Sequence, residues 1–461
     1  MNEPQPVYRD QVLAVEPTGI EPVLPEQRHG NPRDLFGIWF SANAEIATWM
    51  VGIFIVALYG TDLRSALIGI VLGNCAGFAV LGVLATLGPR YGVPQMVASR
   101  FALGRIANIA PATLSFLAGV GWFAINTIFG SYALETLAHI GYPLALAFML
   151  VLQIIIAVYG YNLLARFEHI SAILLAAGFL TLGVVTFSRV DWSTPFHALA
   201  PIASGGPIAG FIFATALSFS YALGWVPCAS DYSRYLPAAT SRKAVFWYSL
   251  AGTAIPCIAL QIMGAATVTL TKADLSASIP TDAIAALLGP HGIVAGLVLA
   301  SIVLGTITAN CMNLYSGALA GLVAFNIRIP RWSAALGVGV IGAILALAGA
   351  NPRDTADSYA NFLLLLSYWA SPWAGVILVN AFMHKQADRE KPQAFRRGAA
   401  AWILGLLASV PFWNQTWFIG PMPRAFPHIG DLSYYVGFLV AALLTFTFER
   451  IRTKTSLIDP T

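Results

Sequence analysis

Residues 39–49 read WFSANAEIATW and place one carboxylate, that of Glu45, inside a long uncharged stretch near the start of the chain. No Lys or Arg within the stretch can neutralise Glu45. An ionisable group at bilayer depth is costly, and it usually faces a translocation pathway or a bound ligand. Glu45 therefore indicates a membrane protein that moves a substrate.

Composition extends this interpretation to the whole chain. Of its 461 residues, 57% are hydrophobic and 10% are charged, and the mean hydropathy is +0.72. This charge is far too little to cover a water-soluble globule of the same size. The formal net charge of +4 reflects membrane orientation, and we infer no nucleic-acid partner from it.

Twelve hydrophobic segments, most of them about 18–27 residues long, match the length that a helix needs to cross about 30 Å of hydrocarbon. They cover approximately 35–59, 64–87, 109–137, 142–160, 168–187, 207–229, 244–270, 293–323, 332–349, 360–383, 398–419 and 432–449. We therefore predict an all-α polytopic membrane protein with twelve transmembrane helices, numbered here as spans 1 to 12.

Arg and Lys accumulate in loops that stay in the cytoplasm, which allows the orientation to be predicted. With a cytoplasmic N-terminus, all but five of the 25 Lys and Arg residues fall inside; the five are Arg64, Arg189, Lys272, Arg353 and Arg424. We predict an integral protein of the plasma (inner) membrane with both termini in the cytoplasm. Residues 1–34 are expected to form a flexible tail without a signal-peptide core, and residues 450–461 a second tail.

The sequence carries no signature of an enzyme or of a metal site. Its four cysteines lie within predicted spans without paired spacing, and its seven histidines are scattered. We find no nucleophile with a matching base and no cofactor-binding loop. We therefore predict a protein that is not an enzyme and that uses no cofactor.

Hydrophobic segments interrupted at matching positions of two halves are typical of inverted-repeat transporters. In span 6, Gly224 and Pro227 predict a break near residues 223–227, because Pro cannot donate to the helix ladder. Span 1 has no Gly or Pro at the same depth, but it concentrates polar residues that can satisfy freed backbone groups: Ser41, Asn43, Glu45 and Thr48. We predict two repeats, over 35–187 and 207–383, and two further helices over 398–449.

Span 3 offers a helix face suited to a planar heterocycle. Trp122 and Asn126 are four residues apart and so share one face. An indole stacks on a flat ring, and an amide both donates and accepts hydrogen bonds at the edge of that ring. The alternative is a packed Trp with an interhelical Asn, which also occurs in membrane bundles.

Span 8 carries four polar side chains within eight positions: Thr306, Thr308, Asn310 and Asn313. The hydroxyl and carbonyl oxygens suit a small hard cation such as Na⁺, and the asparagines suit the polar edge of a ligand. Hydrogen bonding between helices is the competing explanation for each residue.

Other residues near span ends have two possible roles. Tyr368 and Trp369 belong to a run of aromatic residues in span 10 that either gates a central site or packs against neighbouring helices. At the inner end of span 6, Asp231 and Arg234 either form a cytoplasmic ion pair that helps to close this side or position the helix. Glu135 and Glu168 are interpreted as structural.

Five motifs in this order make the chain resemble the nucleobase:cation symporter family, in its purine-cytosine permease branch. They are WFSAN at 39–43, VGWF at 120–123 with Asn126, ASDY at 229–232, NCMNLYS at 310–316, and LLSYW at 365–369 followed by Pro372 and Trp373. The resemblance covers nearly the whole chain. It implies a five-plus-five inverted repeat with discontinuous helices 1 and 6, in a secondary active importer that works by alternating access.

The resemblance also implies a substrate and its binding residues. The substrate would be a purine or pyrimidine base of the cytosine, adenine, hypoxanthine or guanine type. Its ring would stack on Trp122 and on Trp225, or on Phe219 instead, while Asn126 and one of Asn310 and Asn313 contact its polar edge. Ser41 and Asn43 of span 1 complete the expected substrate-binding set.

The coupling ion is expected to be H⁺ or Na⁺. In sodium-coupled relatives, helix 1 carbonyls and adjacent helix 8 hydroxyls hold the ion, whereas here Ile307 separates Thr306 from Thr308. A Na⁺ site near Thr308 is therefore less favoured. Glu45 offers a carboxylate that a proton would neutralise, so we favour H⁺ with Glu45 as the ion-coupling residue.

Alternatives to this function remain open. Within transporters, the substrate could instead be a hydantoin, allantoin, a vitamin B6-type pyridine or a nucleoside, imported with Na⁺. From another class, a ligand-gated channel or a membrane sensor would also use a buried ligand site. The expected partners are the substrate and the lipid bilayer, and a monomer is compatible with the sequence.

Overall fold

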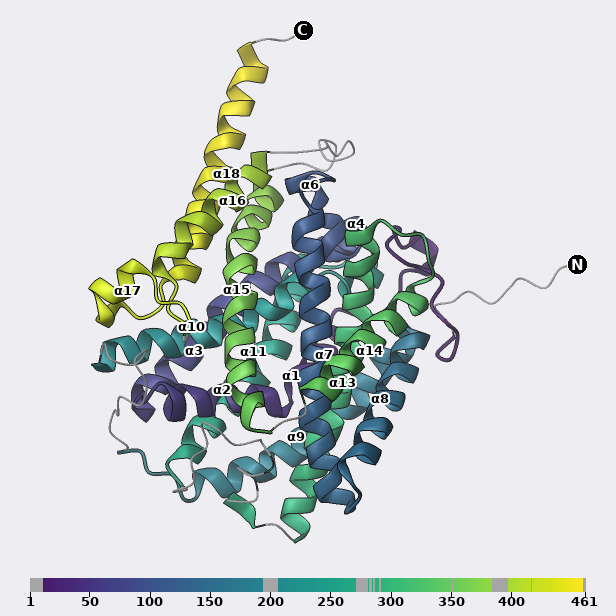
Figure 1. Ribbon diagram of the computed structural model, residues 1–461. Helices are drawn as coiled ribbons and strands as arrows, with labels where there is room; N and C mark the ends of the chain where they lie inside the picture. The colour runs from purple at the N-terminus through teal and green to yellow at the C-terminus, as the bar shows by residue number, and fades with distance from the viewer. Residues whose placement is uncertain are drawn as a thin grey trace, which may run out of the picture.

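The computed structural model describes residues 11–193, 206–270, 292–349, 352–383, 397–415 and 417–458, with a few residues between 281 and 289, and it is a bundle of helices (Figure 1). Ten described helices are long and apolar enough to cross a membrane, and the bent pair of α1 and α2 makes an eleventh crossing. Their bounds are α1 Asp34–Asn43, α2 Ile46–Ile53, α3 Leu63–Ala85, α7 Ile109–Ala138, α8 Tyr142–Tyr159, α9 Tyr161–Phe187, α10 Gly206–Trp225, α11 Arg242–Val268, α13 Ile293–Phe325, α14 Arg331–Ala348, α15 Pro352–Met383 and α18 Ser433–Ile458.

The predicted all-helical polytopic architecture is confirmed, but the exact count of helices is not. The segment expected to cross at 398–419 consists of the shorter helix α16 (Arg397–Ser409) and the 3₁₀ turn η8 (Val410–Phe412). At 13 residues, α16 is shorter than the roughly 20 residues that a perpendicular crossing needs. Twelve crossings therefore stay a prediction.

Span 1 is interrupted at Ala44 and Glu45. The helices on either side of the break are bent by 57° relative to each other, and Glu45 is extended at φ −136° and ψ 167°. Two side-chain donors take the place of the lost backbone partners. Thr308 Oγ1 donates to the carbonyl of Ser41 at 3.0 Å, and Thr48 Oγ1 donates to the carbonyl of Asn43 at 2.7 Å. Non-helical backbone at membrane depth is tolerated because neighbouring side chains satisfy it in this way.

Span 6 changes its geometry at the predicted place. The α-helix α10 passes at residue 226 into the 3₁₀ turn η5 (Val226–Cys228), and the turn η6 (Ser233–Tyr235) follows. Pro227 lies within η5, where its missing N–H interrupts the α-helical ladder. The predicted discontinuity of helices 1 and 6 is confirmed, although the sharper bend lies in span 1, which has neither Gly nor Pro at its break.

The helices pack as two groups, and each group contains helices of both repeats (Figure 1). In the first group, α3 packs on α10 and on α11, and α11 packs on α1 and α2. In the second group, α7 and α13 form the most extensive contact of the fold, and α8 and α14 pack around them. The helices α3 and α10 are spans 2 and 6, and α11 and the α1–α2 pair are spans 7 and 1. The contact of α3 with α10 therefore corresponds to the contact of α11 with α1 and α2, as expected for an inverted repeat.

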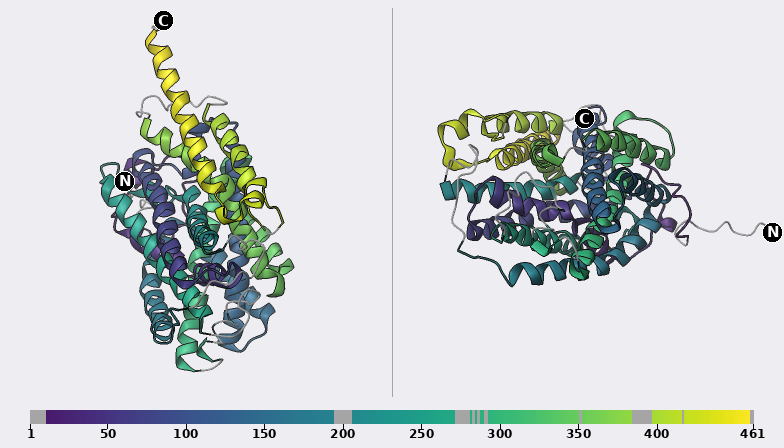
Figure 2. Two further views of the ribbon diagram at one scale, coloured as in Figure 1. Left: turned by 90° about the vertical axis from the view of Figure 1, so that its left-hand side faces the viewer. Right: turned by 60° about the horizontal axis from the view of Figure 1, so that its bottom comes forward.

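The C-terminal helices form a layer at one edge of the molecule (Figures 1 and 2). α18 packs along α15 and α16, and its last turns project beyond the rest of the bundle (Figure 2). α16 and α18 thus lie outside the two groups of helices.

Glycine residues allow α2 and α11 to approach closely. A Cβ atom built on Gly264 would lie 1.9 Å from the carbonyl oxygen of Trp49, and one on Gly52 would lie 1.8 Å from that of Gln261. Small residues at helix contacts are the usual route to tight packing in membranes, where lipid gives no hydrophobic drive between helices.

We expect Gly264→Ala to destabilise the folded protein by about 1–3 kcal/mol, because the added methyl group overpacks the contact of α2 with α11. The matched control is Gly296→Ala on α13, where the added atom would meet nothing within 4 Å. Thermal unfolding of both variants in detergent, followed by size-exclusion chromatography, measures the difference. Equal unfolding temperatures would contradict the packing.

Candidate functional site

The break in span 1 positions Glu45 in the interior of the bundle. Glu45 is fully buried, and its Oε1 accepts a hydrogen bond from the hydroxyl of Tyr221 on α10 at 3.1 Å. Its Oε2 has no hydrogen-bond partner among the described residues. The backbone of Ala44 and Glu45 packs on Gly305 of α13, where a Cβ would lie 2.6 Å from the Ala44 carbonyl oxygen. Glu45 therefore lies where the two groups of helices meet.

An aromatic cluster surrounds Trp122 of α7. The ring of Trp122 makes edge-to-face contacts with Tyr221, Tyr359 and Phe362, with ring centroids 5.5–5.7 Å apart. Gly224 of α10 lies beside the indole, since a Cβ there would be 3.5 Å from the Trp122 Nε1. We call Trp122, Tyr221, Tyr359 and Phe362 the aromatic cluster.

Tyr221 connects the aromatic cluster to Glu45. Its hydroxyl donates to Glu45 and lies 2.6 Å from Thr48 Oγ1, while its ring contacts Trp122. Tyr359 adds a second connection, because its hydroxyl donates to the carbonyl of Ala47 at 3.0 Å. A flat aromatic surface and a buried carboxylate thus share the same small region.

Asn126 lies one helical turn beyond Trp122 and is also fully buried. Both its Nδ2 and its Oδ1 lack a hydrogen-bond partner in the part of the chain that the structure describes. An unpaired buried amide costs free energy and calls for an explanation such as a ligand that binds there. The ligand-binding role of Asn126 stays a prediction.

The two asparagines of α13 differ in their surroundings. Asn310 Nδ2 lies 3.0 Å from each of three acceptors on α7 and α8, namely Phe123 O, Thr127 Oγ1 and Gln153 Oε1. Asn313 Nδ2 donates to Asn310 Oδ1 at 3.2 Å. The amide of Asn310 is therefore used in contacts between helices. The Oδ1 of Asn313 accepts no hydrogen bond from the described residues.

The two threonines predicted for ion coupling do not face one site. Thr308 reaches Ser41 of α1, whereas Thr306 donates to its own helix at Val303 and lies against Gly130 of α7. Residues two positions apart on a helix point in different directions, so of the two candidates Thr308 alone contacts span 1 among the described residues.

Glu168 of α9 is a second buried carboxylate beside span 1. It is fully buried, its Oε2 accepts a hydrogen bond from the Ser41 hydroxyl, and its Oε1 has no partner among the described residues. We interpreted Glu168 as structural because it lies near a predicted span end. Only the packing of α9 on α1 reveals that it lies next to the break.

Several predicted residues lie away from the aromatic cluster. Asn43 donates from Nδ2 to Trp39 O at 2.8 Å and accepts from the thiol of Cys257. Phe219 stacks on Tyr435 of α18, and Tyr368 stacks on Trp413 and donates to Asp431 at 2.9 Å. Trp369 packs near Trp373. Trp225 is buried and meets Trp39 of α1 edge-on, with ring centroids 5.8 Å apart.

Asp231 and Arg234 do not form the ion pair that was one of their two predicted roles. Asp231 Oδ1 accepts from the backbone N–H of Gln95 at 2.8 Å. Arg234 instead pairs with Glu16, with Nη2 and Oε1 2.9 Å apart. The charge of Arg234 is thus balanced by a residue of the N-terminal segment.

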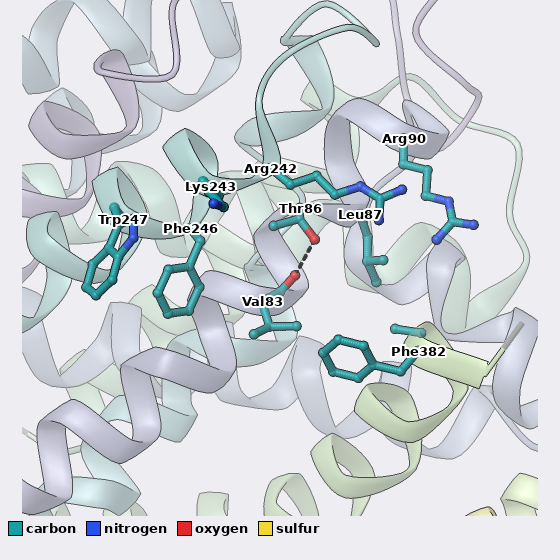
Figure 3. Close-up of a pocket in the computed structure, with 10 residues that line it drawn as sticks. Val83, Thr86, Leu87, Arg90, Arg242, Lys243, Phe246, Trp247 and Phe382 are labelled. Atoms are coloured by element: carbon teal, nitrogen blue, oxygen red, sulfur yellow. Dashed lines mark hydrogen bonds between the residues drawn. The ribbon is translucent and has the colours of Figure 1, made fainter. Parts of the chain in front are cut away.

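A surface hollow of about 250 Å³ lies apart from the aromatic cluster, where the ends of α3, α11 and α15 meet (Figure 3). Its wall contains three cations, Arg90, Arg242 and Lys243, together with apolar side chains that include Trp247 and Phe382. Cations beside exposed aromatics at the ends of spans are typical of the lipid headgroup level. The lining of the hollow thus resembles that of a membrane boundary more than that of a site for a planar ligand. Within the described residues, no group of three or more His, Cys, Asp or Glu side chains could hold a metal ion.

Comparison with known proteins decides the family. Residues 22–437 match the family model described as permease for cytosine/purines, uracil, thiamine, allantoin. The chain belongs to this permease family. It is therefore an integral membrane transporter and not an enzyme, as predicted.

Relatives and solved structures agree with this assignment. The putative purine-cytosine permease YxlA of Bacillus subtilis is 28% identical, over 96% of this permease and 97% of the relative. The purine-cytosine permease fcyB of Emericella nidulans is 27% identical, over 93% and 87%. The fold is similar to that of Mhp1, a nucleobase-cation-symport-1 family transporter, in a closed conformation with bromovinylhydantoin bound, with a TM-score of 0.74, 18% identity, and 95% and 96% coverage. The inverted-repeat fold is confirmed.

The different surroundings of Asn310 and Asn126 predict opposite effects on stability. Asn310→Ala removes the buried donor that Phe123 O, Thr127 Oγ1 and Gln153 Oε1 share and should cost about 1–3 kcal/mol. Asn126→Ala removes an amide without described hydrogen bonds and should leave stability unchanged or raised. Thermal unfolding of the purified, ligand-free permease compares the two variants, and an equal loss for both would contradict the assignment.

Proposed function

We propose that the permease is a secondary active transporter that imports a purine or pyrimidine base together with H⁺. The observation that carries this proposal is Tyr221, which contacts Trp122 through its ring and Glu45 through its hydroxyl. One side chain thus touches both an aromatic surface for a flat ligand and a buried acid. The names of the relatives, which include purine-cytosine permeases of bacteria and fungi, support this class of substrate.

In this proposal, the ring of the base stacks on Trp122, with Trp225 as the second candidate aromatic. The polar edge of the base forms hydrogen bonds with Nδ2 and Oδ1 of Asn126, which lack partners among the described residues, and with Oδ1 of Asn313. A purine or pyrimidine presents donors and acceptors side by side, which an amide matches with two hydrogen bonds. Desolvating an unpaired amide is costly, so these contacts would favour bases over apolar rings.

Proton coupling would operate through the charge of Glu45. An ionised Glu45 accepts the Tyr221 hydrogen bond, whereas a protonated Glu45 is itself a donor and leaves the Tyr221 hydroxyl free to bind elsewhere. Within the part of the chain that the structure describes, the titratable groups that interact with Glu45 are Tyr221, Tyr359 and Cys257, and none of these three is a cation. A proton is therefore the means of neutralising Glu45, and its presence would change the affinity for the base, as coupling requires.

Na⁺ coupling is the second candidate, and one observation favours it. Thr308 Oγ1 lies 3.0 Å from the carbonyl oxygen of Ser41 at the end of α1, and the carboxylate of Glu168 contacts the Ser41 hydroxyl. These oxygens together resemble a set of ligands for a small cation. The substrate would then be a hydantoin, allantoin, a vitamin B6-type pyridine or a nucleoside.

Import also requires a defined orientation. We propose that the N-terminal segment and the ends of α10, α13 and α18 face the cytoplasm of a plasma (inner) membrane, because Lys and Arg gather on that side. Concentrative uptake separates this transporter from a channel, which cannot accumulate ligand, and from a sensor, which binds without flux.

Replacing Trp122 by Ala should lower affinity for the base by about 1–3 kcal/mol, the range found for stacking of a base on an aromatic side chain. Uptake of radiolabelled cytosine and adenine into proteoliposomes at low concentration measures the loss. The control is Trp247→Ala, since Trp247 is exposed on the outside of α11. Normal uptake by a folded Trp122→Ala protein would contradict the proposed stacking of the base on Trp122.

Glu45→Gln should abolish accumulation driven by a proton gradient while leaving exchange of base across the membrane. The amide keeps the shape of the carboxyl group but cannot take up or release a proton. We would measure uptake into proteoliposomes with an imposed pH gradient, with and without Na⁺, for the wild type and both Glu45→Gln and Thr308→Ala.

The outcomes of this experiment separate the two ions. Accumulation that needs a pH gradient, ignores Na⁺ and is lost in Glu45→Gln supports the proposal. Accumulation that needs Na⁺ and is lost in Thr308→Ala supports the second candidate. If Glu45→Gln retains proton-driven accumulation, the proton is handled elsewhere, and Glu168→Gln is the next variant to test.

A further inference from the structure

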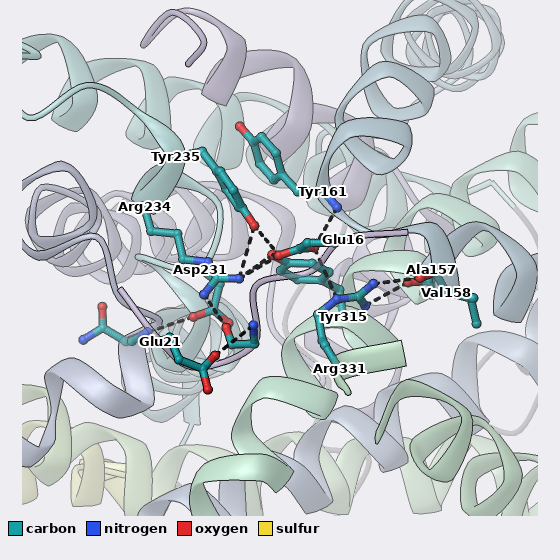
Figure 4. Close-up of polar contacts among 12 residues, drawn as sticks. Glu16, Glu21, Ala157, Val158, Tyr161, Asp231, Arg234, Tyr235, Tyr315 and Arg331 are labelled. Carbon is teal, nitrogen blue, oxygen red and sulfur yellow. Dashed lines mark hydrogen bonds and ion pairs between the residues drawn. The ribbon is translucent and has the colours of Figure 1, made fainter. Parts of the chain in front are cut away.

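The N-terminal segment, residues 11–33, packs into the bundle. We predicted a flexible tail over residues 1–34, but Glu16 is only 3% exposed and Val23 is 1% exposed. The backbone N–H of Glu16 donates to Tyr159 O at 2.9 Å, and that of Val23 donates to Gly92 O at 2.8 Å. The segment therefore enters between the ends of helices, where Figure 4 shows the carboxylate of Glu16 at the centre of a polar network.

On one side, the Glu16 carboxylate binds residues that follow α10. Oε1 accepts from Arg234 Nη2 at 2.9 Å and from the hydroxyl of Tyr235. The guanidinium of Arg234 also donates from Nη1 to the carbonyl of Gly19 at 2.6 Å. The N-terminal segment thus holds the η6 turn at two points (Figure 4).

On the other side, the same carboxylate binds the second group of helices. Oε1 accepts from the hydroxyl of Tyr315 on α13 at 3.0 Å, and Oε2 accepts from the N–H of Tyr161 on α9 at 3.0 Å. Oε2 also lies 3.2 Å from Nε of Arg331 at the start of α14. Arg331 in turn donates to the carbonyls of Ala157 and Val158 at the end of α8.

Glu16 is therefore a shared counter-ion of two buried guanidiniums. The side chains of Glu16, Arg234 and Arg331 are all 0% exposed. Removing one partner of a buried ion pair leaves an uncompensated charge out of water, which is strongly unfavourable. The bridge holds the end of α10 against α13, α14 and the α8–α9 junction for as long as Glu16 stays in place.

We propose that Glu16 is a latch that holds one side of the permease closed, and that its contacts with Arg234, Tyr315 and Arg331 must break before that side opens. In inverted-repeat transporters, alternating access is largely a movement of one group of helices against the other around a fixed site. Opening at this face separates the η6 turn from α13, which breaks the contacts of Glu16 on at least one side. The latch rests on transport by alternating access and is independent of which base or ion is carried.

The native cysteines allow the latch to be tested without activity measurements. Cys228 in η5 lies against Ser316 of α13 and so reports on the boundary between the two groups. Cys257 contacts Asn43 within the first group, and Cys311 contacts Gln153 within the second. Cys228 is half-buried, and Cys257 and Cys311 are buried, whereas Cys75 is exposed throughout. Opening at this face increases the exposure of Cys228 alone among the three, whereas loss of the fold exposes all three.

The experiment compares the full-length wild type, Glu16→Gln and Glu21→Gln in detergent micelles by timed labelling with N-ethylmaleimide and peptide mass spectrometry. Glu21 is the matched control, because it is an exposed carboxylate of the same segment whose Oε2 accepts from the Gly19 N–H. We expect Glu16→Gln to label Cys228 about tenfold faster or more, a shift of about 1.4 kcal/mol toward the open state. Labelling of Cys257 and Cys311 should not change, and Glu21→Gln should match the wild type.

Two results would overturn the latch. Equal labelling of Cys228 in Glu16→Gln and the wild type would mean that the bridge does not hold this face closed. Faster labelling of all three cysteines would mean that Glu16 only stabilises the fold. Failure of the base or of the ion in uptake experiments would leave this result unaffected, so the two proposals fail separately.

Discussion

The absence of water from the bilayer core is the constraint on which the rest of this structure depends. Backbone that leaves a helix at that depth must find partners within the protein. At Ala44 and Glu45 these partners are the hydroxyls of Thr48 and Thr308, and the missing side chain of Gly305 lets the freed backbone approach α13. The break in turn places Glu45 beside Tyr221, which brings an acid next to the aromatic cluster.

Two of the side chains that span the boundary between the two groups of helices are central to the proposals made for this permease. In the interior, Tyr221 of the first group contacts Trp122 of the second and also binds Glu45. At the N-terminal face, Glu16 binds both Arg234 and Tyr315. Both are buried contacts between elements that move relative to each other in transporters of this kind, and in our proposals each one favours a closed arrangement.

The sequence predicts a residue well when its role follows from its own helix. The spacing of Trp122 and Asn126 placed both on one helix face, and Pro227 predicted the break in span 6, because periodicity and proline chemistry are local properties. It predicts poorly when the role depends on a distant partner. Asn310 and Asn313 are equivalent in the sequence, and only the contact of Asn310 with Gln153 of α8 distinguishes them. Tyr359 and Glu168 had no local signal that set them apart.

By itself, the sequence determined that this protein is an all-helical polytopic membrane protein that resembles a known transporter family, and that a carboxylate, Glu45, lies in its first span. The membrane fold and the position of Glu45 follow from hydropathy and from the cost of a charge in lipid, and the family follows from the resemblance of five motifs. Only the tertiary structure decided that Thr308 but not Thr306 reaches span 1, that Arg234 pairs with Glu16 rather than Asp231, and that part of the N-terminal tail is buried. Each of these depends on contacts between segments far apart in the chain. The packing of the helices sets which residues meet in such contacts, and the local sequence pattern does not.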